Sequence, residues 1–271
     1  MDQATYQGIA LDAQTALALL EWQLEMGADT PLLDDPVDRF DLPAQAAPAI
    51  PMAQPVPPVA AASDTDDLPA RIAEAEALAS AADTLDALAA AQEGFDGIEL
   101  KKGARRFCFA DGRAGARVLI LGEAPGDEED RQGRPFVGRA GQLLDRMFGA
   151  IGLARDAVDA ERALYITNVL GWRPPGNRDP SPDEIAVSLP FVRRHIQLAQ
   201  PDLVVLMGNV ATQAAVGRRG ILRLRGQWVQ AFERPALPMT HPAYLLRNPA
   251  AKREAWADLL SLAARLEALS V

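Results

Sequence analysis

The sequence predicts an α/β fold: a parallel β-sheet covered by helices, preceded by a flexible N-terminal extension. From about residue 93, short apolar runs alternate with segments of helical periodicity, which is typical of parallel α/β sheets. The central runs at 116–122 (ARVLILG) and 202–208 (DLVVLMG) have no alternating polar face, as expected for strands that are buried on both sides. Residues before 70 are instead rich in alanine, proline and acids.

The N-terminal part divides into three segments. Apolar residues at helical spacing predict an amphipathic helix over 8–27, inside an N-terminal segment that we bound at 1–40. Residues 41–69 are Pro/Ala-rich and then acidic. That composition cannot bury enough apolar surface to form a core, so we expect a disordered linker. Residues 70–92 have helical character and open the folded domain, which we bound at 70–271.

The remaining elements alternate along the chain. Strands are predicted at 116–122, 162–170, 202–208 and 235–242, and the prolines of the last one are typical of an edge strand. Helices are predicted at 140–151, 182–200, 209–217 and 249–269, and Pro182 suits the first turn of its helix.

Cysteine usage and apolar pattern exclude several classes of protein. No apolar run approaches the length of about 18 residues that a membrane span needs, so no membrane contact is expected. The N-terminus lacks the basic and apolar regions of a signal peptide. Cys108 is the only cysteine, which permits neither an internal disulfide nor a four-cysteine metal site. We therefore expect a cytoplasmic protein, and we expect it to be a monomer.

The charge is distributed unevenly between the two parts of the chain. Residues 1–100 carry 2 Lys and Arg against 19 Asp and Glu, whereas residues 101–271 carry 25 against 18. Nearly all the bases of the second part are arginines, which suit bidentate contact with phosphate. This asymmetry indicates contact with a polyanion such as nucleic acid, although arginine enrichment of the genome would produce the same pattern.

Polar residues gather at the predicted carboxyl ends of the strands, where open α/β sheets place their sites. The first strand ends in GEAPG with Glu123, the second in Asn168, the third in Gly208-Asn209, and the fourth in His241. A carboxylate, an amide and one of only two histidines therefore fall on one rim.

Several familiar sites do not fit this rim. No GK[ST] follows the first turn, so it is not a P-loop. Its carboxylate also disfavours a dinucleotide site, and the chain has no G-x-S-x-G hydrolase elbow. The acids Asp127, Glu128 and Asp130 suggest a metal site, but negative charge is favourable at a helix N-terminus in any case. We expect no metal.

The residues of the rim suit hydrolysis of an N-glycosidic bond on a flipped nucleotide. Glu123 is able to activate water, and Asn168 offers a donor and an acceptor that match a nucleobase edge. His241 is able to stabilise a departing anion, and Phe136 in GRPFVG is suited to stacking on a base.

Three motifs in order, GEAPG…EDRQGRPFVGRAGQLLD, N-x-x-x-x-RPPGNRDP-x-P-x-E and THPAYLLR followed by K-x-x-x-W, resemble those of the family-four uracil-DNA glycosylases. The resemblance covers about residues 93–262. It implies a three-layer αβα sandwich around a four-stranded parallel sheet. It also implies removal of uracil from single- or double-stranded DNA, by base flipping and water attack, with an abasic site as the product.

The resemblance also implies the roles of individual site residues. Glu123 would position or activate water, Asn168 would read the uracil edge, Phe136 would stack on the base, and His241 would donate to uracil O2. The turn would let the base and its sugar come close through Gly122, Ala124, Pro125 and Gly126. Structural roles stay open for these side chains: a turn acid, a strand-end cap, a core ring and a turn histidine.

Contacts with DNA are expected from arginines and from one loop. Phosphate contacts are expected at Arg134, Arg139, Arg173, Arg178, Arg223 and Arg225, although any of them is equally suited to a solvated surface. In the resemblance, the loop of Leu245, Leu246 and Arg247 fills or flanks the gap in the duplex. Which residue inserts stays open, as does a core role for either leucine.

The chain departs from the family at the iron–sulfur cluster that many members bind through four cysteines. Those positions correspond to Phe95, Ile98, Trp172 and Ser188, and Cys108 matches none of them. Because such a cluster needs several thiolates, we expect no iron–sulfur cluster and no other cofactor. We expect packing by Phe95, Ile98 and Trp172 to replace it, as in a cysteine-poor branch of the family.

Two other functions stay open. The first is a non-catalytic or trapping protein that binds uracil or abasic DNA, but trapping relatives carry an extra basic, histidine-containing loop, and none occurs between residues 146 and 165. The second is a polymerase-associated accessory domain that is recruited through residues 8–27. The acidic N-terminal part would then bind a protein partner, compete with DNA, or serve only as a solubilising tail.

Overall fold

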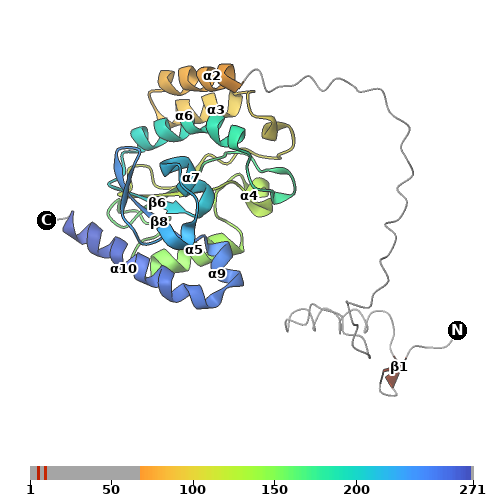
Figure 1. The fold of residues 1–271 in the computed structure, drawn as a ribbon, viewed down its shortest axis with the longest axis vertical. Coiled ribbons are helices and arrows are strands. Elements are labelled where there is room, and N and C mark those ends of the chain that lie inside the picture. Colours follow the sequence, from red (N-terminus) through yellow and green to blue (C-terminus); the bar gives the residue numbers. More distant parts are fainter. Residues whose placement is uncertain (1–4, 7–8, 11–67, 270–271) are drawn as a thin grey trace. The chain divides into compact units, whose positions relative to one another are not determined.

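The computed structural model of the protein describes residues 5–6, 9–10 and 68–269 (Figure 1). The chain divides into two units, 1–61 and 62–271. In the first unit, strands β1 (Thr5–Tyr6) and β2 (Ile9–Ala10) pair antiparallel. The helix predicted over 8–27 is therefore wrong at residues 9–10. The rest of that helix and the predicted linker lie outside the described residues, apart from Leu68 and Pro69, which begin the first helix of the second unit.

The second unit is built on a six-stranded sheet with the order β3-β5-β4-β6-β8-β7. Its four central strands are parallel: β5 (Leu164–Asn168), β4 (Val118–Gly122), β6 (Leu203–Met207) and β8 (Arg234–Met239). Every residue of β4, β5 and β6 is buried. The predicted α/β class and its four parallel strands are confirmed.

Two short antiparallel strands, β3 (Ala110–Gly112) and β7 (Val229–Ala231), extend this sheet at its edges. The prediction that the fourth parallel strand lies at an edge is wrong, because β7 pairs with the first half of β8, with Val229 opposite Ala236. Beyond that point the carbonyl of Pro238 accepts a hydrogen bond from the Gly226 amide. Proline lacks an amide donor but keeps its carbonyl as an acceptor. The prolines of β8 therefore do not prevent hydrogen bonds along the side of the strand that faces β7 and Gly226.

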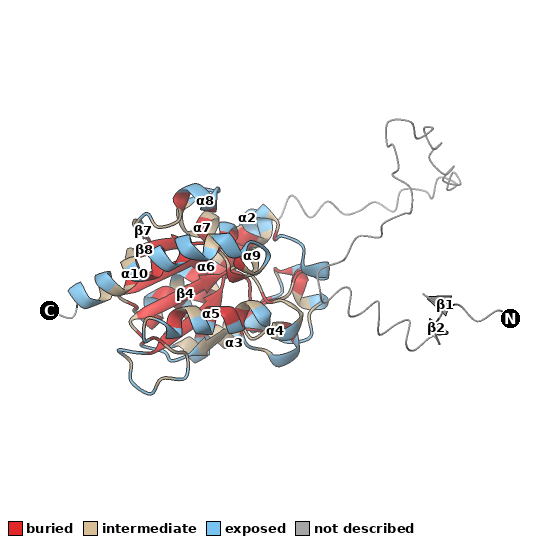
Figure 2. Ribbon diagram, turned by 90° about the horizontal axis from the view of Figure 1, so that it is seen from below, coloured by how far each residue is buried: buried red, intermediate tan, exposed pale blue. Residues whose placement is uncertain are grey.

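Helices cover both faces of the sheet, as Figure 2 shows by the buried residues concentrated along the strands between them. Leu119 and Leu121 of β4 point to a core shared with α6 (Pro182–Ala199) and α7 (Asn209–Val216). Val118 and Ile120 point to the opposite core, shared with α5 (Arg139–Gly149) and α10 (Lys252–Ala268). This alternation is the period of a β-strand, and it gives three layers.

Helices α2 (Leu68–Ala81) and α3 (Leu85–Gly94) lie beside α6 (Figure 1) and share a third apolar cluster with it. The helical character predicted for residues 70–92 is confirmed, and the chain forms two helices there. Thr84 divides them because its side chain accepts a hydrogen bond from the Ala87 amide and so caps α3.

Several short helices and 3-10 turns lie in the segments that connect the strands and longer helices. Three are α-helical: α4 (Asp127–Gln132), α8 (Ile221–Leu224) and α9 (Pro242–Arg247). Others in the described second unit are 3-10 turns, namely η2 (Glu99–Lys102), η3 (Pro175–Asn177) and η4 (Pro249–Ala251). The first turn of α4 holds four acids, which confirms the predicted place of these charges at a helix N-terminus. In the part of the chain that is described, no helix is long and apolar enough to span a membrane.

Candidate active site

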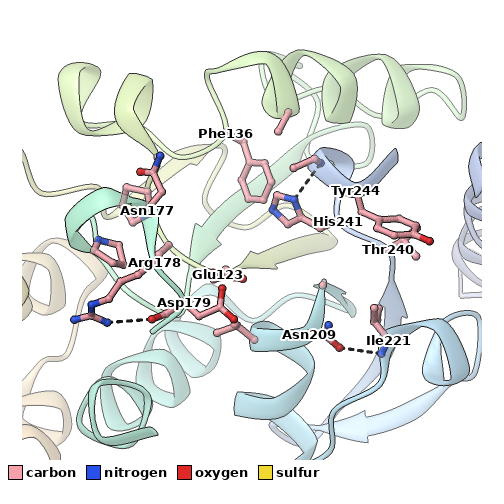
Figure 3. Close-up of a pocket in the computed structure, with 18 of the residues that line it drawn as sticks. Glu123, Phe136, Asn177, Arg178, Asp179, Asn209, Ile221, Thr240, His241 and Tyr244 are labelled. Carbon is pink, nitrogen blue, oxygen red and sulfur yellow. Dashed lines mark hydrogen bonds between the residues drawn. The ribbon is translucent and has the colours of Figure 1, made fainter. Parts of the chain in front are cut away.

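A cavity of about 730 Å³ opens at the carboxyl end of the parallel strands. Figure 3 shows Glu123 near its centre, with Phe136 and His241 on one side and Asn209 and Ile221 on another. Three of the four predicted chemical side chains line it, namely Glu123, Phe136 and His241. Predicted base-contacting and DNA-contacting residues also line it: Ala124, Pro125, Gly126, Arg178 and Arg247.

Glu123 follows the last residue of β4 and is partly buried. Loss of hydration, and to a smaller extent the negative charge of Asp179, raise the pKa of its carboxyl to about 7, although the positive charge of Arg219 acts in the opposite direction. A carboxyl with a pKa near neutrality is able to exchange a proton at physiological pH, which is the property of a general base.

The raised pKa of Glu123 predicts a pH-dependent stability effect of Glu123→Gln. Between pH 4.5 and about 7 the unfolded chain loses this proton while the folded chain keeps it, so stability falls as pH rises through that window. The amide cannot ionise. We expect the melting temperature of the variant to match that of the protein at pH 4 and to exceed it at pH 8. An equal difference at both pH values would contradict the assignment.

Phe136 is fixed in a turn with a positive φ of 53°, a conformation that costs energy for a bulky residue. Arg155 holds this turn by donating from Nη2 to the Phe136 carbonyl at 2.8 Å. Glu129 accepts hydrogen bonds from the Val137 and Gly138 amides at 2.9 Å each. These contacts fix the backbone turn that carries the ring, and no sequence pattern identified Arg155 or Glu129.

Asn168 ends β5 and is buried, and neither its Oδ1 nor its Nδ2 has a hydrogen-bond partner. Neither Asn168 nor Gly122 lines the cavity, but both adjoin Phe136, which does. A Cβ atom at Gly122 would overlap both Asn168 Oδ1 and the edge of the Phe136 ring, so only glycine fits between them. An unsatisfied buried amide costs about 1–3 kcal/mol, which a ligand edge would recover.

His241 follows β8 and caps α9. Its Nδ1 accepts a hydrogen bond from the Ala243 amide at 3.2 Å, so the neutral ring carries its proton on Nε2. Desolvation, and to a smaller extent the positive charge of Arg247, lower the pKa of His241 to about 4, although the charge of Glu129 acts in the opposite direction. The ring centroid lies 5.4 Å from that of Phe136. His241 is therefore a neutral donor beside the cavity.

The arginines expected at phosphates fall into two groups. Four are already ion-paired with carboxylates: Arg134 with Asp111, Arg173 with Asp127, Arg178 with Glu184 and Arg225 with Asp258. Asp258 is buried, so the pair at Arg225 has a structural role. In residues 68–269, no ion pair engages Arg139, Arg223 or Arg247.

The segment expected to fill the duplex gap is helical, and only part of it is accessible. Leu245 is fully buried, in a cluster with Leu143 and Ala255. Of the two roles left open for Leu245, the structure therefore favours the core role. Leu246 is half-buried against the same cluster, whereas Arg247 is exposed and lines the cavity. Arg247 is the residue of this segment that is best placed to contact DNA.

The residues at the four iron–sulfur positions do not fit such a cluster. Phe95, Ile98 and Trp172 pack together in the apolar core beneath α2, α3 and α6, and Ser188 is buried. Cys108 donates instead to the Glu129 carbonyl at 3.2 Å, and burial raises the pKa of its thiol. Thiolates are the ligands that these clusters require, and the chain supplies one thiol.

Further cavity-lining residues were not identified as site residues from the sequence. The polar ones among them are Glu129, Asn177, Asp179, Asn209, Arg219, Thr240 and Tyr244. The sequence did contain a signal for some of them: Asn177 and Asp179 belong to the RPPGNRDP motif, Thr240 precedes His241, and Asn209 directly follows a predicted strand. Arg219 stands in a loop without a motif.

Comparisons with known proteins agree with this architecture. The model of the Uracil DNA glycosylase superfamily matches residues 109–260. Type-4 uracil-DNA glycosylases of Sulfurisphaera tokodaii and Thermotoga maritima are each 40% identical, over 149 and 143 residues. Each match covers 51% of this chain, and 65% and 70% of the respective relative. A DNA polymerase of Bacillus phage SP01 is 32% identical over 152 residues, which are 56% of this chain and 16% of the polymerase.

The matched region runs from β3 into α10, and so contains the whole sheet and every wall of the cavity. Because the family model covers more than half of the 271 residues, the chain belongs to the uracil-DNA glycosylase superfamily.

Proposed function

We propose that the protein is a uracil-DNA glycosylase, which hydrolyses the N-glycosidic bond of deoxyuridine in DNA, releases uracil and leaves an abasic site. The observation that carries this proposal is the buried, unpartnered amide of Asn168 beside a cavity that holds Glu123 and His241. The names of the type-4 relatives support the same activity. Its substrate would be uracil-containing DNA, and its location would be the cytoplasm.

Asn168 would recognise the uracil edge. Its Oδ1 would accept from uracil N3–H and its Nδ2 would donate to O4, which satisfies both unpartnered atoms. Cytosine presents the reverse pattern, an acceptor at N3 and an amine at C4, so it would leave the amide unsatisfied. Because the amide lies behind Gly122 and Phe136, the base would leave the DNA stack and displace the edge of the Phe136 ring to reach it.

Glu123 and His241 would act on opposite sides of the reaction. The bond between C1′ and N1 breaks, and its electron pair stays on uracil. A water oxygen bonds to C1′ and gives its proton to the Glu123 carboxylate, which the pKa of about 7 makes available near neutrality. The Nε2–H of neutral His241 donates to O2 of the departing anion. No step uses a cofactor.

The activity is tested with the full chain and a uracil-containing oligonucleotide, single- and double-stranded, without added metal. We expect free uracil and an alkali-labile abasic site, and no release of cytosine or thymine. Absence of uracil release over hours would reject the proposal. A DNA adduct that survives denaturation, in place of turnover, would instead identify a trapping protein.

Asn168→Ala tests base recognition. We expect kcat/KM for uracil excision to fall by roughly 10²-fold, because both hydrogen bonds to the base are lost. Binding to a duplex with a tetrahydrofuran abasic-site analogue should stay unchanged, because that ligand has no base to read. Equal weakening of both measurements would contradict the assigned role and indicate a structural defect.

A further inference from the structure

We propose that the segment Arg218–Arg223, which runs from the end of α7 into α8, is a second DNA-contacting element. Its arginines would bind phosphates beside the extruded nucleotide, and Leu222 would pack against the exposed neighbouring base. The inference rests on the proposed function, because its ligand is the DNA that carries the lesion.

Hydrogen bonds and buried side chains fix the segment Arg218–Arg223 beside the cavity. Asn209 Oδ1 accepts hydrogen bonds from the Gly220 amide at 3.1 Å and the Ile221 amide at 2.9 Å, as Figure 3 shows for Asn209 and Ile221. Ile221 and Leu224 are buried and anchor α8 to the fold. A contact made by this segment therefore needs little further ordering, which lowers its entropic cost.

Leu222 is an exposed apolar side chain on this anchored helix. It is 58% exposed and lines the cavity. The other large apolar residues that are exposed in the described part of the chain, among them Trp256 and Leu260 on α10, do not line it. Apolar side chains of this kind serve DNA-binding proteins as wedges between base steps, and an extruded nucleotide leaves its neighbour unstacked.

The arginines of the segment are free to meet phosphates. Within residues 68–269, Arg218, Arg219 and Arg223 have no carboxylate partner. Arg219 donates to the Gln213 side chain and lines the cavity. Arg223 was already expected at a phosphate from the sequence; of the other expected arginines, Arg134, Arg173 and Arg178 are ion-paired, so a phosphate contact there would compete with a carboxylate.

Arg247 extends this basic edge from α9. It is exposed, has no ion pair in the described residues and lines the same cavity as Arg219. Free cations at two rims of one cavity are complementary to the phosphates on either side of a flipped nucleotide, and such contacts position DNA without reading its sequence.

The charge contribution is tested by salt dependence. For the full chain and a duplex with a tetrahydrofuran abasic-site analogue, the slope of log K against log salt should become shallower by about 2 in the double variant R218A/R223A, since each duplex phosphate contact contributes about 0.9. Arg219 is left in place because its charge acts on Glu123. R193A is the control and should not change the slope, because Arg193 is an exposed residue of α6 that does not line the cavity and forms no ion pair with the described part of the chain.

The apolar contribution is tested by Leu222→Ala against Leu260→Ala, which truncates a leucine of similar exposure on α10. We expect Leu222→Ala to lower kcat/KM about tenfold on duplex DNA and less on single strands, and Leu260→Ala to change neither. An unchanged salt slope together with equal behaviour of the two leucine variants would overturn the inference. Because the binding ligand contains no uracil, absence of catalysis would reject the proposed function without deciding the role of this segment.

Discussion

Glu123→Ala is expected to lower kcat for uracil release by a factor of about 10²–10⁴, the usual contribution of a positioned general base. Loss of hydration and the charge of Asp179 raise the pKa of Glu123 to about 7, so the carboxylate is basic enough to accept a proton from water. Alanine removes the carboxylate that activates water, whereas Asn168, which would recognise the base, is unchanged. KM and binding to abasic-site DNA should therefore change little.

The measurement is single-turnover excision as a function of pH, which isolates chemistry from product release. In the unsubstituted protein the rate should rise as pH increases through about 7, because the ionised carboxylate is the active form. The residual rate of Glu123→Ala should not show this rise. Glu128→Gln, at an exposed acid of the same motif that does not line the cavity, is the control and should keep full activity. A pH-independent rate in the unsubstituted protein would exclude Glu123 as the base.

The parallel sheet could be predicted because its signal is local. Strands β4 and β6 are continuous apolar runs, and the helices have clear periodicity and ends, such as Ser181 with Glu184 at the start of α6. The edge strands could not be predicted. β3 and β7 are three residues long, contain exposed residues and exist because β5 and β8 offer free edges. Their pairing is a tertiary effect that no short window of sequence contains.

The chemical residues could be predicted because strand ends in such folds converge on one rim. The supporting contacts could not. Arg155 reaches the Phe136 carbonyl and Asp111 from distant positions in the chain, and the amides that Glu129 accepts from lie beyond a turn. The sequence shows which side chains are charged but not which of them form ion pairs with each other. Phosphate contacts were therefore expected at Arg173 and Arg178, whose guanidinium groups are ion-paired with carboxylates in the structure.

The assignment of Leu245 illustrates the same limit. The sequence places Leu245, Leu246 and Arg247 together after the histidine motif, and nothing in it decides which of them face solvent. The helical geometry of α9 does so, because it turns Leu245 into the cluster with Leu143 and leaves Arg247 exposed. In a single helical turn, neighbouring residues point in different directions, so a motif that is uniform in sequence is divided between core and surface.

His241→Ala is expected to lower kcat by about 10²–10³, the cost of removing one donor from a developing anion. Two roles must be separated, because His241 Nδ1 also caps α9 through the Ala243 amide. Loss of such a cap costs about 1 kcal/mol of stability. His241→Ala would therefore lose both the cap and the Nε2–H donor to the departing anion.

His241→Asn separates these roles, since asparagine is among the best capping residues but its shorter amide cannot place a donor where Nε2 lies. We expect His241→Asn to keep the melting temperature of the unsubstituted protein and still to lose at least tenfold in the single-turnover rate. With a pKa of about 4, His241 stays neutral above pH 5, so neither its titration nor its loss should move the rise in rate near pH 7. If His241→Asn restored both stability and rate, His241 would be a helix cap only, and the departing uracil anion would depend on another donor.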